Sequence, residues 1–146
     1  MLNIYNPMAL SLEQKLVYVS FLCYLAKADA NVAVKEESFI KAIIARFQIS
    51  PLMLKQLKLP ASVKDFPAVL APIKDQEVAI DLLHCLWFAT LLDDEIAQQE
   101  IETVREIAKI LNINDETLLM LNNFVSDEIS FLQQAEEVLK TNLLAL

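Results

Sequence analysis

The chain has 146 residues, of which 55% are apolar and none is glycine, and it carries a net charge of −8. This length suits one domain, residues 1–146, with a substantial core. Without glycine there is no glycine-rich phosphate loop or dinucleotide fingerprint, because both need its conformational freedom, and helices are favoured over tight hairpins.

Apolar residues at helical spacing predict three helices in the first half of the chain. Ser11 and Gln14 have the spacing of a capping box at the start of the first helix. Ser50 precedes Pro51, which is the arrangement of a cap followed by proline in the first helical turn. The three predicted helices span residues 11–28, 34–47 and 51–57.

The stretch 58–74 is predicted to connect the two halves of the chain. Pro60, Pro67 and Pro72 punctuate it, and proline interrupts a helix because it lacks the backbone N–H and clashes with the preceding turn. We therefore expect at most one short helical turn here, near residues 63–70.

The second half repeats the helical pattern of the first, with Asp75 and Asn114 at the positions of caps. Its predicted helices span residues 75–92, 98–111 and 115–124. A further helix, 126–141, is predicted to begin at Ser126-Asp127-Glu128, because acids in the first turn suit the positive end of the helix dipole. We expect its apolar side chains to close the core: Leu132, Ala135, Val138, Leu139, Leu143 and Leu144.

An internal repeat of 64 residues relates the two halves, 11–57 and 75–121, and predicts a duplicated helical unit. The clearest match is an interhelical turn that recurs with the same residue types and spacing: Asp29, Val32 and Glu36 correspond to Asp93, Ile96 and Glu100. The fold class predicted from these patterns is all-α, a compact bundle of about seven helices built from two related halves.

The acidic turns are the best candidates for a binding site. Carboxylate oxygens gathered around a turn suit hard cations such as Ca²⁺, Mg²⁺ or Mn²⁺. If the halves pack about a pseudo-dyad, the acids of the two turns would meet and repel each other, and a divalent cation would relieve that repulsion. The candidate metal ligands are Asp29, Glu36, Asp93, Asp94 and Glu100.

A purely structural interpretation of the same residues stays open. Glu36 and Glu100 stand at about the third position of their predicted helices, where a glutamate can reach back to unpaired backbone amides. Asp29 and Asp93 would then hold the turns, and no ion would be bound. An EF-hand is excluded, because the chain has no twelve-residue loop with a central glycine.

These residues also carry a family resemblance. The stretch Ala26-Lys27-Ala28-Asp29-Ala30-Asn31-Val32, followed by Glu36 and an Ile-rich helix, resembles the ADG-x-V…E signature of tellurite-resistance TerB-like domains. The acidic domain of a membrane-anchored DnaJ-type co-chaperone is similar. The resemblance covers residues 11–121. It implies an all-α bundle of two related halves, an acidic patch that holds divalent cations, and a role in stress response through protein partners.

The chain departs from the family pattern in both copies of the turn. Ala30 and Asp94 replace the family's glycine, and Ala33 and Ala97 replace the hydroxyl residue that starts the next helix. These positions are the ones on which the family's turn geometry and its acidic site depend. The second turn gains carboxylates in exchange, so it is the better candidate for a cation.

Charge and hydropathy indicate which partners and which cellular location the protein has. Residues 1–74 hold nine basic side chains against five acidic ones, whereas residues 75–146 hold three against fifteen. An acidic chain without a basic stripe is a poor partner for nucleic acid. The charge-free apolar runs, 16–26 and 82–92, are shorter than the roughly 20 residues of a membrane span, and no signal peptide is visible, so we expect a cytoplasmic protein without direct membrane insertion.

Two functions follow as expectations from the residues and the resemblance. The first is a non-enzymatic, TerB-like stress-response protein that binds divalent cations through its acidic turns. The alternative is a helical adaptor that binds a protein partner through an apolar groove, with purely structural acidic turns. His84, the one histidine, is expected to be a packed helix residue, and Cys23 and Cys85 are expected to be buried free thiols. In either case we expect a monomer or weak homodimer with a protein partner.

Overall fold

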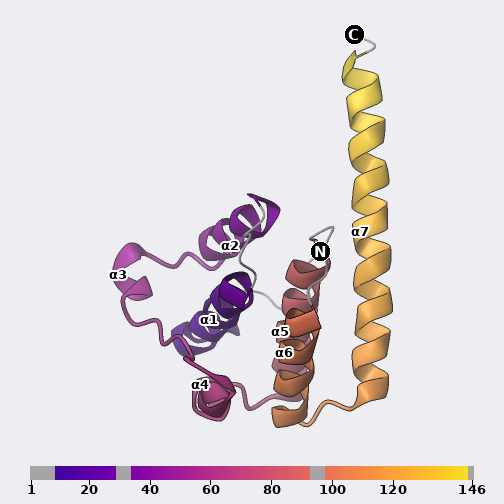
Figure 1. The fold of residues 1–146 in the computed structure, drawn as a ribbon. Coiled ribbons are helices and arrows are strands. Elements are labelled where there is room, and N and C mark those ends of the chain that lie inside the picture. Colours follow the sequence, from indigo (N-terminus) through magenta and orange to yellow (C-terminus); the bar gives the residue numbers. More distant parts are fainter. Residues whose placement is uncertain (1–8, 29–33, 93–97, 145–146) are drawn as a thin grey trace.

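The computed structural model describes residues 9–28, 34–92 and 98–144, and within these ranges the fold is all-α, with no strand. The described residues form seven α-helices and one 3-10 turn (Figure 1): α1 (Leu12–Ala28), α2 (Val34–Arg46), α3 (Pro51–Leu54), η2 (Val63–Asp65), α4 (Phe66–Leu70), α5 (Gln76–Leu91), α6 (Gln98–Ile110) and α7 (Asp115–Leu144). No helix of this described part is long and apolar enough to cross a membrane.

The central element is α5. Twelve of its 16 residues are buried, as expected of a helix that is apolar around its whole circumference. It packs against α1, α6 and α7, and these neighbours surround it in Figure 1. Every face of α5 therefore meets another part of the core.

Aromatic edge-to-face contacts attach the shorter elements to α1. The ring of Phe66, at the start of α4, lies 5.1 Å from the rings of both Phe21 and Tyr24. The ring of Phe47, just after α2, lies 5.2 Å from that of Tyr18. Such pairs add to the free energy gained by burial alone. They explain why α4 forms within the proline-rich connector, where only a short turn was expected.

The predicted helix caps are confirmed. Ser11 and Gln14 form a reciprocal capping box, in which the Gln14 N–H donates to Ser11 Oγ (3.1 Å) and the Ser11 N–H donates to Gln14 Oε1 (3.0 Å). Side-chain oxygens of Ser50, Asp75 and Asn114 accept backbone N–H groups at the starts of α3, α5 and α7. These caps satisfy amides that have no partner inside the helix.

The 64-residue repeat recurs in the helix boundaries. The first residues of α5, α6 and α7 each stand 64 positions after those of α1, α2 and α3. The turns that end α2 and α6 also match, because Gln48 (φ 55°) and Asn112 (φ 60°) both adopt a left-handed conformation. In both turns the next residue returns a backbone hydrogen bond, from Ile49 to Ile44 and from Ile113 to Ala108.

The prediction of two separate C-terminal helices, 115–124 and 126–141, is wrong. One continuous helix of 30 residues, α7, replaces both. Ser126, Asp127 and Glu128 lie in its interior and do not begin a new helix. Capping residues start a helix only where the preceding chain is not already helical, and no proline or glycine interrupts residues 115–144.

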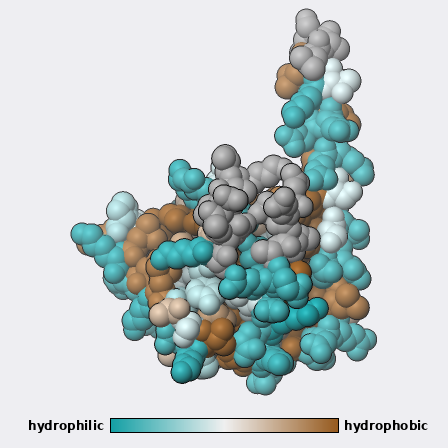
Figure 2. Space-filling model, viewed as in Figure 1, coloured by the Kyte–Doolittle hydropathy of each residue, from teal (hydrophilic) through white to brown (hydrophobic). Residues whose placement is uncertain are grey.

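The prediction that the C-terminal residues close the core is also wrong. Leu118 and Val125, in the first half of α7, are buried, and this half packs against α5. The second half projects beyond the other helices (Figure 1). In Figure 2 hydrophobic side chains appear among the hydrophilic ones along this projection. Its large apolar side chains are exposed: Phe131, Leu132, Val138, Leu139 and Leu143.

Candidate functional site

Glu36 and Glu100 occupy equivalent positions in the two copies of the repeat. Each is the third residue of its helix, Glu36 in α2 and Glu100 in α6. Each is also buried, with 5% and 1% of its surface exposed. A glutamate is rarely buried to this extent. Its burial here follows from helix geometry, because the residues three and seven positions later face the core: Phe39 and Ile43 in α2, and Thr103 and Ile107 in α6.

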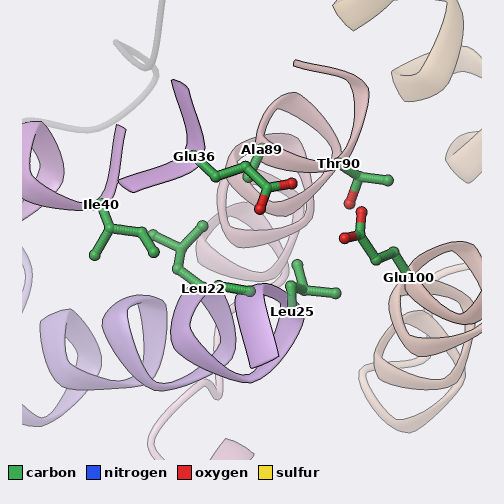
Figure 3. A pocket seen from close by; sticks show the side chains of 8 residues that line it. Leu22, Leu25, Glu36, Ile40, Ala89, Thr90 and Glu100 are labelled. Carbon is green, nitrogen blue, oxygen red and sulfur yellow. The ribbon is translucent and has the colours of Figure 1, made fainter. Parts of the chain in front are cut away.

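The two glutamates line one cavity. The cavity has a volume of about 10 Å³, the space that a single water molecule needs. Its walls come from four helices: Leu22, Leu25 and Ala26 of α1, Glu36 and Ile40 of α2, Ala89 and Thr90 of α5, and Glu100 of α6. Figure 3 shows the two carboxylates directed toward the space between α2 and α6. The Thr90 hydroxyl lies beside the Glu100 carboxylate.

Three of the side chains that line this cavity carry oxygen atoms: Glu36, Thr90 and Glu100. The Thr90 hydroxyl donates its hydrogen to the Leu86 carbonyl (2.9 Å), so its oxygen keeps lone pairs for another group. Carboxylate and hydroxyl oxygens are ligands that Ca²⁺, Mg²⁺ and Mn²⁺ accept. The apolar side chains of Leu22 and Leu25 on the other side lower the local dielectric, which strengthens any charge interaction there.

The structure brings two of the five predicted ligands together. Glu36 and Glu100 share the cavity, whereas Asp29, Asp93 and Asp94 lie outside the described residues. Within the described ranges, no group of three or more His, Cys, Asp and Glu side chains is placed to hold a metal ion. The positions of both glutamates in a first helical turn also suit the positive end of the helix dipole, so the structural interpretation of these residues stays open as well.

A second group of polar side chains lies inside the core, around α5. The Tyr18 hydroxyl donates to Asp81 Oδ2 at 2.6 Å, which connects α1 to α5. One turn further along α5, His84 Nε2 lies 2.6 Å from Glu128 Oε1 of α7. The ring of Phe124 covers His84 edge-on, with the ring centroids 5.5 Å apart. These contacts connect α5 to the helices on two of its sides.

Sequence reasoning missed Glu128 as the partner of His84. The expectation that His84 is a packed helix residue is confirmed, since only 1% of it is exposed. Glu128 was assigned to the first turn of a separate helix, where its role was to complement the dipole. One signal pointed to a polar contact at this place: Asp81 and His84 stand three residues apart in the most apolar helix of the chain, and such buried polar groups need partners.

Burial changes the ionisation of two groups on α5. Burial raises the pKa of Asp81, although the Tyr18 hydroxyl and the charges of His84 and Arg46 act in the opposite direction. Burial and the nearby Asp81 carboxylate raise the pKa of the Cys85 thiol well above its ordinary value. Burial also raises the pKa of the half-buried Cys23. Both cysteines are free thiols, and a raised pKa disfavours the reactive thiolate form of each.

No protein-family model matches the chain, and neither a curated protein nor a solved structure matches it. The resemblance to TerB-like domains therefore stays a prediction from the residues that carry it.

Proposed function

We propose that this chain is a non-enzymatic, TerB-like stress-response domain that binds a divalent cation between the two acidic turns of its repeat. One observation carries the proposal: Glu36 and Glu100, equivalent residues of the two copies, are both buried and line the same cavity. Carboxylates in a low-dielectric interior attract opposite charge strongly. A cation shared by the two halves would bind both side chains, beside the contacts that they already make, and hold α2 and α6 together.

The sequence supplies further oxygen ligands for such an ion. Asp29 precedes Glu36 by seven residues, and Asp93 precedes Glu100 by the same number, with Asp94 adjacent to it. Ca²⁺ takes six to eight oxygen ligands, which two glutamates and Thr90 do not provide. We therefore propose that carboxylates of the acidic turns complete the set.

The proposal of a non-enzymatic role is supported by the positions of the reactive side chains. The only histidine of the sequence, His84, is buried and paired with Glu128. Cys85 is fully buried. Catalytic acids, bases and nucleophiles have to reach a substrate, and these two side chains are enclosed by the core.

Thermal melting tests the cation proposal. The chain is treated with EDTA and melted alone and with millimolar Ca²⁺, Mg²⁺ or Mn²⁺. An ion that binds only the folded form adds about 2.7 kcal/mol at a hundredfold excess over its Kd. We expect one of these ions to raise the melting temperature of the wild type and to have no such effect on the double variant Glu36→Gln/Glu100→Gln.

The matched control is Glu37→Gln/Glu102→Gln. It removes the same charge from the same two helices, but at exposed positions, so it should keep the ion response. A melting temperature that none of the ions changes would overturn the proposal. An equal response of all three proteins would also overturn it, because it would reflect general screening of an acidic surface.

A groove on another side of the molecule favours the adaptor as a second candidate function. It has a volume of about 820 Å³ and lies between α1 and the segments 55–58 and 68–74. Apolar residues that line it include Leu16, Val17, Leu57 and Val69, and three lysines line it as well: Lys55, Lys58 and Lys74. This combination fits an acidic, amphipathic helix, whose apolar face would enter the groove while its carboxylates meet the lysines.

Binding of a labelled helical peptide of leucine and glutamate, followed by fluorescence anisotropy, tests the adaptor. We expect binding that weakens with salt and that Lys58→Glu/Lys74→Glu reduces by at least about tenfold, equivalent to 1.4 kcal/mol. Lys64→Glu, which changes a lysine of η2 that does not line the groove, should bind as the wild type does. Equal binding by both variants, or no binding by any, would contradict the adaptor.

A further inference from the structure

The second half of α7 is a helix that the rest of the described chain does not cover. From Phe131 to Leu143 every side chain is exposed except that of Ala135, which is half-buried. Residues 130–144 extend over about 22 Å at 1.5 Å per residue, and Figure 1 shows them standing free of the other helices. An isolated helix of this length is marginally stable in water, because most helices depend on tertiary packing.

This part of α7 carries a row of apolar side chains with an internal symmetry. Phe131, Leu132, Val138 and Leu139 are 68%, 42%, 59% and 62% exposed. Phe131 and Leu132 stand four and three residues before Ala135. Val138 and Leu139 stand three and four residues after it. Residues at these spacings share one face of a helix. The row is therefore symmetric about Ala135, the smallest side chain within it.

We propose that this row packs against the same row of a second copy, in an antiparallel pair of α7 helices with its two-fold axis at Ala135. A two-fold interface uses the same patch on both chains, so the patch must complement itself. Reversal about Ala135 brings Phe131 of one copy opposite Leu139 of the other, and Leu132 opposite Val138. The small Ala135 side chains at the crossing allow the two helices to approach closely.

The charges of this segment favour a second copy over other occupants. Residues 130–144 hold two acids and one base, Glu136, Glu137 and Lys140, and Lys140 pairs with Glu136 of the same helix at 3.7 Å. A basic partner would find little charge to bind, and a single lysine gives little attraction to an anionic membrane surface. In an antiparallel pair the remaining helices of the two acidic chains lie at opposite ends of the pair. This distance limits the repulsion between the two chains.

The area of the row is sufficient for a weak but specific dimer. Phe124, 55% exposed, stands seven residues before Phe131 and extends the row toward the body of the fold. Aromatic and aliphatic side chains of this size would together bury on the order of 1,000 Å² over both copies, the lower limit for a specific interface.

Sedimentation velocity over a range of concentrations tests the pairing. We expect a reversible dimer in the wild type, and in Leu139→Lys a dissociation constant raised about a hundredfold, because two copies each lose a buried leucine. The matched control is Ser130→Lys, which adds the same charge at an exposed position on the opposite side of α7 and should dimerise as the wild type does. A wild type that stays monomeric overturns the proposal, as does equal weakening by both variants.

Cysteine pairing tests the antiparallel direction in a Cys23→Ser background. In the proposed dimer two cysteines at position 131 would be eight residues apart along the axis, about 12 Å, beyond the reach of a disulfide. Under a mild oxidant we therefore expect Phe131→Cys and Leu139→Cys chains to cross-link when mixed, and neither to cross-link alone. Cross-linking of either variant with itself would indicate a parallel pair and overturn the proposal. Co-sedimentation with phosphatidylglycerol vesicles is a separate measurement. A chain that stays monomeric and co-sediments with these vesicles would also overturn the proposal.

Discussion

His84 and Glu128 join the middle of α5 to the middle of α7, with His84 Nε2 2.6 Å from Glu128 Oε1. The contact is made where α7 leaves the core, because Val125 is buried and the residues from Phe131 onward are exposed. It is thus the last polar contact between the long helix and the rest of the described fold.

Removal of Glu128 should loosen α7. Glu128→Ala leaves the buried imidazole of His84 without this partner, and an unsatisfied buried polar group costs about 1–3 kcal/mol. We expect the free energy of unfolding in urea to fall by that amount. Asp127→Ala is the control, because Asp127 is the exposed neighbour on the same helix; a fall of equal size in both variants would contradict a specific role for the contact.

The carboxyl of Asp81 should make stability depend on pH. Burial raises its pKa above the ordinary 3.8, so the folded chain binds this proton more tightly than the unfolded chain does. The resulting stabilisation is complete below the ordinary value and is lost as the pH rises through the raised one.

Asp81→Asn cannot ionise but keeps an oxygen that the Tyr18 hydroxyl can donate to. We expect its stability, measured by urea unfolding, to gain relative to the wild type as the pH rises from acid to neutral. Asp127→Asn should not show this gain, since its side chain is exposed. A constant difference between Asp81→Asn and wild type at all pH values would refute the prediction.

The two left-handed residues should respond differently to glycine. Gln48 and Asn112 have similar positive φ angles, but asparagine adopts this conformation more readily than glutamine. We expect Gln48→Gly to raise the free energy of unfolding by about 0.5–1 kcal/mol and Asn112→Gly to change it less. Chemical denaturation of the two variants checks this, and an equal gain at both sites would show that residue type does not matter there.

The two thiols should react at very different rates. Cys85 is buried with a pKa well above its ordinary value, and Cys23 is half-buried with a raised pKa. A thiol-specific chromogenic reagent should label Cys23 slowly and Cys85 only after denaturation, because the thiolate is the reactive form. Cys23→Ser should abolish labelling of the folded chain. Rapid labelling of that variant would contradict the complete burial of Cys85.

Local signals in the sequence determined most of the helix boundaries. The caps at Ser11, Ser50, Asp75 and Asn114 and the apolar periodicity each act within one or two turns of chain, so they can be recognised without a structure. The 64-residue repeat added a check, because it required the second half to copy the first. The helix starts of the structure keep this offset.

Two of the five candidate ligands could be recognised from the sequence in the same way and are described by the structure. The repeated turn identified Glu36 and Glu100, and the expected pseudo-dyad predicted that they would approach each other. Their burial and their common cavity could not be predicted from the sequence, because an exposed capping glutamate and a buried one have the same local pattern. Only the packing of α2 and α6 around α5 distinguishes the two.

The tertiary structure alone decided the course of α7 and the partner of His84. Ser126-Asp127-Glu128 has the composition of a helix start, but a chain that is already helical continues through such residues when nothing interrupts it. Whether an apolar stripe is buried depends on which surface lies beside it, and α5 ends before the second half of α7. Sequence periodicity therefore determined which residues share a face of that helix, whereas the reach of the neighbouring helices decided that this face stays exposed.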